Sequence, residues 1–95
     1  MELTIQAVKF TMDDDQKEFV VKKFDRITYA EDIIVDVSCK IKYDKKFTYD
    51  CTVNFKGNTA HVSAEEYDFN AGINKLMDVL DQKVRKEKEK LHDKK

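Results

Sequence analysis

The sequence lacks proline altogether and has only two glycines, Gly57 and Gly72. Proline and glycine interrupt helices and strands most often, so we expect long elements joined by short loops, which disfavours an active site built from loops. No apolar run approaches the ~20 residues that a membrane helix needs. Residues 1–4 also lack the basic and then apolar layout of a signal peptide. We therefore expect a soluble, cytoplasmic protein without a membrane partner.

Cysteine and histidine are scarce as well. Cys39 and Cys51 are too few for a disulfide scaffold, and too few to hold a structural zinc without help. His61 and His92 lie far apart in the chain and have no ligand spacing. The sequence contains no nucleophile elbow, phosphate-binding glycine loop, HExxH helix or CxxC pair. We expect no enzyme activity, and neither catalytic residues, a metal, a cofactor nor a small-molecule substrate.

The overall charge does not select a partner. The 18 Lys and Arg residues are balanced by 19 Asp and Glu residues, so the formal net charge of -1 gives no argument for an anionic partner, and only the placement of the charges can. At 95 residues and 41% hydrophobic residues, the chain can build one core and has no room for a second. We expect a single domain over residues 1–95.

The first part of the chain predicts a strand followed by a helix. Apolar and polar residues alternate over residues 3–7, as in a strand with one buried face. Asp13 and Gln16 have the spacing of a capping box, which predicts that a helix begins near Asp14. Its apolar stripe fades around residues 28–30.

Alternation returns over residues 33–43, 47–55 and 60–65, which predicts three antiparallel strands. Residues 44–46 form the first loop, and residues 57–58 suit a two-residue primed turn because Gly and Asn tolerate positive φ. On the inner face of the first of these strands we place Val35, Val37, Cys39, Ile41 and Tyr43.

From Asp68 onward the apolar period becomes helical, and this last helix outruns the core. The resulting order, β-α-β-β-β-α, predicts an α+β fold in which two helices cover one face of a four-stranded sheet and leave the other face polar. We expect the core to include Ile5, Phe24, Val37, Val53, Val62, Leu76 and Leu80. The loop at residues 44–46 places Cys39 opposite Cys51, and we expect two reduced, buried thiols there.

The last helix carries a basic stripe. Lys75, Lys83, Lys86 and Lys90 fall within an arc of roughly 80° at 100° per residue, while Asp78, Asp81 and Glu89 lie toward the other side. Such a stripe could contact phosphates, and Lys22 and Arg26 of the first helix would extend it. On composition alone the plain alternative, a solvated helix with ion pairs such as Asp81 with Arg85, is favoured by about two to one.

Three stretches resemble a known family over the whole chain. They are Lys17-Glu18-Phe19-Val20 with Lys23-Phe24, then His61-Val62-Ser63-Ala64-Glu65, and then Asp68-Phe69-Asn70-Ala71-Gly72-Ile73. In this order they look like the ribosome hibernation-promoting factors, a family that includes the ribosome-associated inhibitor A or sigma-54 modulation proteins.

The resemblance implies a fold like that of double-stranded-RNA-binding domains and a function without catalysis. The domain would lodge between the head and body of the small ribosomal subunit, overlap the messenger and transfer RNA sites, and silence translation under stress or in stationary phase. Its partners would be the small subunit and ribosomal RNA, and the free protein would be a monomer. By motif position the resemblance assigns RNA contacts to Lys23, Arg26, Arg85, Lys86 and Lys88, and the basic stripe adds Lys22, Lys75, Lys83 and Lys90.

The sequence departs from the family's pattern at four positions. Val79 and Gln82 stand where the family usually has Lys and Arg, Asn70 where it often has Tyr, and Asn74 where it usually has Asp. Lys75 and Lys83 lie on the same side of the helix as the missing pair and could restore phosphate contacts.

Two further alternatives stay open at this point. The chain looks like the family's short form, yet it would look the same as an excised N-terminal domain of the long form. A protein-interaction module is the rival function, in which an edge strand or the exposed sheet face would mediate pairing. The residues of that face would be Thr4, Gln6, Lys40, Thr48 and Thr52.

Overall fold

The computed structural model describes residues 1–93, with their side chains as far as residue 90. In chain order the elements are β1 (Glu2–Val8), α1 (Asp14–Phe24), the 3-10 helix η1 (Asp25–Ala30), β2 (Ile34–Asp44), β3 (Lys46–Phe55), β4 (Asn58–Glu66) and α2 (Phe69–Asp93). The predicted order β-α-β-β-β-α is confirmed.

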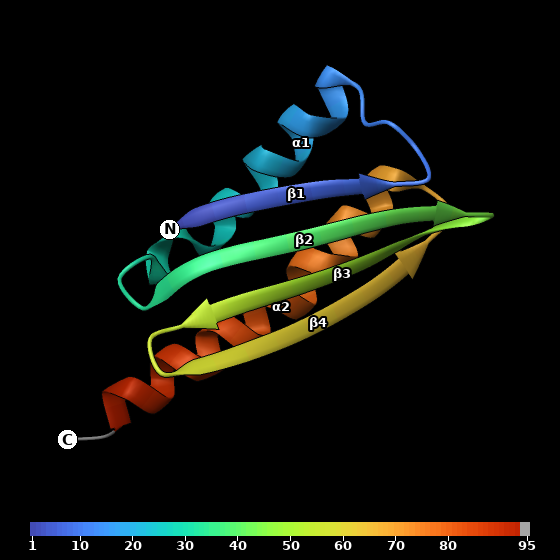
Figure 1. Ribbon diagram of the computed structural model, residues 1–95. Coiled ribbons are helices and arrows are strands. Elements are labelled where there is room, and N and C mark those ends of the chain that lie inside the picture. The colour runs from blue at the N-terminus through green and yellow to red at the C-terminus, as the bar shows by residue number, and fades with distance from the viewer. Residues whose placement is uncertain (94–95) are drawn as a thin grey trace.

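The four strands form one sheet in the order β1-β2-β3-β4. β1 pairs with β2 in parallel, and the other two pairs are antiparallel. Figure 1 shows α1 and α2 behind the sheet, on the same face. The predicted α+β architecture, with one covered and one open face, is therefore confirmed.

Side-chain caps fix where the two long helices begin. The Asp13 carboxylate accepts a hydrogen bond from the backbone N–H of Gln16 at 2.8 Å, and the Gln16 side chain accepts one from the backbone N–H of Asp13 at 3.1 Å. This is the predicted capping box, which satisfies two otherwise unpaired donors. Asp68 accepts a hydrogen bond from the Ala71 N–H at 2.9 Å, so it caps α2 in the same way.

The core lies between the sheet and the two helices. Of the residues predicted to be buried, Phe24, Val37, Val53, Val62, Leu76 and Leu80 are at most 4% exposed. Ile5 is only partly buried, because β1 is an edge strand of the sheet.

One close approach in the core requires glycine. The Tyr49 side chain is fully buried, and its hydroxyl donates a 2.8 Å hydrogen bond to the Phe69 carbonyl at the start of α2. A Cβ added at Gly72, in the first turn of the same helix, would overlap the Tyr49 ring. Gly72 thus lets the start of α2 lie directly against β3.

The inward placement of Val35 was wrong. The register between β2 and β3 shifts between Ile34 and Asp36, so Ile34 is buried and Val35 is 51% exposed. An extra residue on one strand reverses the alternation on one side of the irregularity, which the apolar pattern alone does not reveal. Tyr43 keeps the inward alternation of Val37, Cys39 and Ile41, and its ring lies 4.8 Å from that of Phe47, but near the end of the strand it is 42% exposed.

Both hairpin turns differ by about one residue from the prediction. The second turn lies at Lys56 and Gly57 rather than at residues 57–58, and only Gly57 has positive φ, at 95°. Both primed turn types need positive φ at the first central residue, which is Lys56 here, so this prediction was wrong. The loop at residues 44–46 contracts to Lys45 alone, which adopts a φ of 68°.

Cys39 and Cys51 are register partners, as predicted, and both thiols are free and buried. The hydrogen bond with Cys39 and the burial of the pair raise the pKa of Cys51 above its usual value. A thiol held neutral in this way is a poor nucleophile, which fits its role as a small core residue.

Candidate nucleic-acid interface

The buried stripe of α2 divides its exposed surface into two flanks. We call the side that carries Lys75, Lys83, Lys86 and Lys90 the β4 flank, because its last three lysines border a groove against β4. We call the other side the η1 flank. It carries Asp78, Asp81, Arg85 and Lys88, which meet side chains from η1 and from the loop that follows it.

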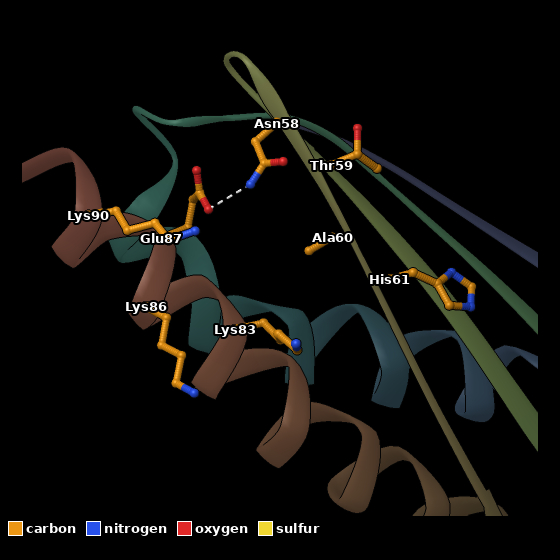
Figure 2. A pocket seen from close by; sticks show the side chains of 8 residues that line it. All are labelled: Asn58, Thr59, Ala60, His61, Lys83, Lys86, Glu87 and Lys90. Atoms are coloured by element: carbon orange, nitrogen blue, oxygen red, sulfur yellow. Dashed lines mark hydrogen bonds between the residues drawn. The ribbon is translucent and has the colours of Figure 1, made fainter.

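The groove of the β4 flank is open and has a volume of about 300 Å³. Figure 2 shows Lys83, Lys86 and Lys90 in sequence along α2, with the first residues of β4 beside them. All three lysines are exposed. Among the side chains of residues 1–90, none of the three forms an ion pair. Their ammonium groups are available to an outside anion.

β4 contributes polar groups to the same groove. Asn58 donates a 2.9 Å hydrogen bond to Glu87, which ties the start of β4 to α2 (Figure 2). The Thr59 hydroxyl and the His61 ring lie further along the strand. His61 reaches over to the open face of the sheet, where its Nδ1 lies 3.1 Å from the Thr52 hydroxyl.

On the η1 flank every basic side chain has an acidic partner. Arg26 uses one terminal nitrogen for Asp78, at 2.9 Å, and the other for Asp81, at 3.4 Å. Arg85 uses Nε for Asp81, at 3.3 Å. A separate pair joins Lys88 to Asp32 at 3.0 Å.

Asp81 is the centre of the η1 flank. It is 8% exposed, and it also accepts a 2.7 Å hydrogen bond from the Tyr29 hydroxyl. Burial acts to raise the pKa of the Asp81 carboxyl, but the Tyr29 hydrogen bond and the two guanidinium groups outweigh it, so the pKa lies below its usual value. Asp81 is therefore an ionised, well-satisfied carboxylate.

The predicted RNA-contacting residues thus fall into separate groups. Lys83, Lys86 and Lys90 border one groove, and Lys75 lies on the same helical arc two turns earlier. Lys22 is exposed on α1, and the Lys23 ammonium lies 5.2 Å from the centre of the Phe19 ring.

The expectation that Arg26 extends the β4 flank was wrong, because its guanidinium lies on the opposite side of α2, between Asp78 and Asp81. The four departures from the family pattern, at Asn70, Asn74, Val79 and Gln82, are all exposed. Sequence reasoning found the Asp81–Arg85 pair from its helical spacing. It missed Tyr29 and Asp32, which are more than 50 residues away from their partners on α2.

The chain is similar to known proteins over nearly its whole length. The model of the sigma 54 modulation protein / S30EA ribosomal protein family matches residues 3–92. The ribosome hibernation promoting factor of Escherichia coli K12 is 34% identical over 92 residues, which cover 96% of this chain and 97% of the relative. That of Salmonella typhimurium LT2 is 30% identical over the same shares.

Two solved structures share the fold. A ribosomal subunit interface protein from Coxiella burnetii superimposes with a TM-score of 0.85 at 24% identity, over 93% of this chain and 98% of the other. The N-terminal domain of Protein Y from Thermus thermophilus gives a TM-score of 0.81 at 21% identity, over 90% and 98%.

Proposed function

Because the chain belongs to the sigma 54 modulation protein / S30EA ribosomal protein family, we propose that it binds the ribosome and keeps it inactive without any catalysis. Its curated relatives are ribosome hibernation promoting factors that match it over nearly their whole length. More specifically, we propose that the protein is a cytoplasmic monomer. In this proposal it occupies the messenger and transfer RNA region of the small subunit.

The single observation that carries RNA binding is the row of lysines on the β4 flank that form no ion pair with the described side chains. Lysine ammonium groups act as point charges for phosphate, and contacts to phosphate position a protein on RNA without reading its sequence. The separation of Lys83, Lys86 and Lys90 along one helix side suits a run of backbone phosphates rather than a single anion. The acidic residues that bring the net charge near zero lie elsewhere, so the groove stays basic apart from Glu87.

The proposed set of RNA contacts keeps all nine predicted residues, but they differ in whether the side chain already interacts within the protein. Lys22, Lys75, Lys83, Lys86 and Lys90 are exposed and can meet phosphate directly. The other four already interact within the protein and would have to share or exchange a partner on binding, namely Lys23, Arg26, Arg85 and Lys88.

Co-sedimentation with small ribosomal subunits tests this proposal. We expect the triple substitution of Lys83, Lys86 and Lys90 by Glu to abolish sedimentation and to relieve inhibition in a cell-free translation assay. The matched control replaces Lys9, Lys42 and Lys56 by Glu, which changes the net charge equally at exposed positions outside α2.

The control triple distinguishes an effect of the charge at the groove from an effect of the net charge of the protein. We expect the control triple to sediment like the parent, and circular dichroism of both triples to show an intact fold. Unchanged sedimentation of the β4 flank triple would refute the proposal. Equal loss in both triples would indicate a non-specific charge effect, or a protein contact through the open sheet face on which Lys42 lies.

A further inference from the structure

The Asp81 carboxylate organises three donors from two elements. Tyr29 donates from η1 at 2.7 Å, Arg85 from the next turn of α2 at 3.3 Å, and Arg26 from η1 at 3.4 Å. The side chain of Asp81 is only 12% exposed, whereas that of Arg85 is 67% exposed. A nearly buried anion therefore anchors a cation that reaches into solvent.

The orientation of Arg85 is fixed from two directions. The bond to Asp81 uses Nε, at the base of the guanidinium group, and among the side chains of residues 1–90 no ion pair engages the two terminal nitrogens. The central carbon of the same group lies 5.7 Å from the centre of the Tyr29 ring, within the range of a cation–π contact. The Tyr29 hydroxyl in turn holds Asp81.

Arg26 contacts the same carboxylate in a different way. Both of its terminal nitrogens are taken, one by Asp78 and one by Asp81, and its side chain is 41% exposed. Arg26 is therefore neutralised, while Arg85 is anchored with its outer edge free.

We propose that Asp81 and Tyr29 are positioning residues that hold Arg85 as a preformed fork for a phosphate group of RNA. This inference rests on the proposed function and deepens it, because it adds one oriented contact on the η1 flank to the flexible lysines of the β4 flank. A guanidinium group matches two phosphate oxygens at once. Fixing its rotamer before binding saves the ordering cost of about 0.5 to 1.5 kcal/mol for such a side chain.

The substitution Asp81→Asn tests the inference, because the two explanations predict opposite changes in affinity for RNA. If Asp81 were only a negative charge near RNA, its removal would strengthen binding. If Asp81 positions Arg85, its removal weakens binding by roughly 2- to 12-fold, which is the ordering cost expressed as affinity. The measurement is the Kd for isolated small ribosomal subunits at constant salt.

Asp78→Asn is the matched control. It removes the same charge from the same flank, but the Asp78 side chain is 69% exposed and, among the described side chains, bonds only to Arg26. We expect Asp78→Asn to leave binding unchanged or to strengthen it. Tyr29→Phe keeps the ring and removes the hydroxyl, so it should weaken binding less than Asp81→Asn does, and it serves as the second variant if Asp81→Asn does not fold.

Repeating the two substitutions in an Arg85→Ala protein distinguishes an effect on the orientation of Arg85 from a general effect on stability. There, Asp81→Asn and Tyr29→Phe should no longer weaken binding, because the group they orient is gone. Weakening that persists in this background would overturn the inference, as would unchanged or tighter binding by Asp81→Asn in the parent. If the β4 flank triple loses binding while Asp81→Asn binds tighter, only this inference fails; if that triple still binds, the proposed function fails first.

Discussion

Both flanks of α2 carry basic side chains, but they differ in what those side chains meet. On the η1 flank Arg85 and Lys88 pair with Asp81 and Asp32, and Arg26 lies between two aspartates. On the β4 flank Lys83, Lys86 and Lys90 form no ion pair with any side chain of residues 1–90. The comparison teaches that the number of basic residues in a sequence overstates the positive charge a partner meets.

The difference follows from what each flank faces. The η1 flank meets a second element that supplies Tyr29 and Arg26, so buried and half-buried hydrogen bonds accumulate there. The β4 flank meets an edge strand whose residues bordering the groove are Asn58, Thr59, Ala60 and His61, none of them acidic. Ion pairs of exposed carboxylates such as Asp78 and Asp32 add at most about 1 kcal/mol of stability, so these two pairs matter mainly for the charge they cancel.

The largest expected effect comes from the stripe that separates the flanks. Leu80 is fully buried, and Leu80→Ala should lower the free energy of unfolding by about 2 to 5 kcal/mol, because it removes apolar contacts and leaves a cavity. Val79 is 37% exposed, so Val79→Ala should change stability by no more than about 0.5 kcal/mol. Urea unfolding followed by circular dichroism measures both, and equal losses would show that α2 is rotated from the position described.

A smaller loss is expected where α2 begins. Gly72→Ala places a methyl group into the Tyr49 ring, and relieving such overpacking typically costs about 1 to 3 kcal/mol. Ala71→Gly, at the exposed neighbouring position, is the control for backbone entropy and should cost less than about 1 kcal/mol. A fully stable Gly72→Ala protein in urea unfolding would contradict the close packing of Phe69–Asp93 against β3.

A comparison of single lysines sharpens the contrast between the flanks. Lys86→Ala removes a cation that forms no ion pair with the described side chains, whereas Lys88→Ala removes one paired with Asp32. We expect Lys86→Ala to weaken binding to small subunits more than Lys88→Ala, and to reduce the dependence of log affinity on log salt by about 0.7 to 0.9. Equal effects in a filter-binding titration would mean that pairing within the protein does not limit phosphate contact.

The smallest expected effect concerns Tyr29 at alkaline pH. Burial first, and then the hydrogen bond to Asp81, raise the pKa of Tyr29 from 10.0 to about 12. Above about pH 10 the unfolded chain loses this proton while the folded chain keeps it, so the stabilisation present below pH 10 is lost as the pH rises toward 12. Between pH 9 and 11, roughly, the melting temperature of the parent should fall slightly more than that of Tyr29→Phe. An equal fall in both proteins would argue against the Tyr29–Asp81 hydrogen bond.

Much of the fold could be predicted from local pattern, and the failures have physical causes. Period-two alternation, the Asp13 capping box and the helical stripe of α2 are local signals, and they gave the element order and most of the core. The exposure of Val35 depends on a register shift between two strands, and the contraction of the loop at Lys45 depends on strand pairing. Neither feature can be recognised from the pattern of apolar residues in the sequence.

The candidate site was only partly predictable for the same reason. The helical arc of Lys83, Lys86 and Lys90 follows from sequence spacing, because positions on one helix are fixed relative to one another. The neighbours of Asp81 do not follow from it, because Arg26 and Tyr29 approach from an element more than 50 residues away in sequence. Sequence spacing therefore gave the position of each charge on α2, but not the partners that neutralise it.

The central claim, that the β4 flank contacts RNA phosphates, is tested most directly by the salt dependence of binding to small ribosomal subunits. The parent should be compared with the triple Lys83→Ala, Lys86→Ala and Lys90→Ala, and with a control triple that replaces Lys9, Lys42 and Lys56 by Ala. If three phosphate contacts are lost, the slope of log affinity against log salt should become shallower by about two to three in the β4 flank triple and stay unchanged in the control. A β4 flank triple with the slope and affinity of the parent would contradict the account.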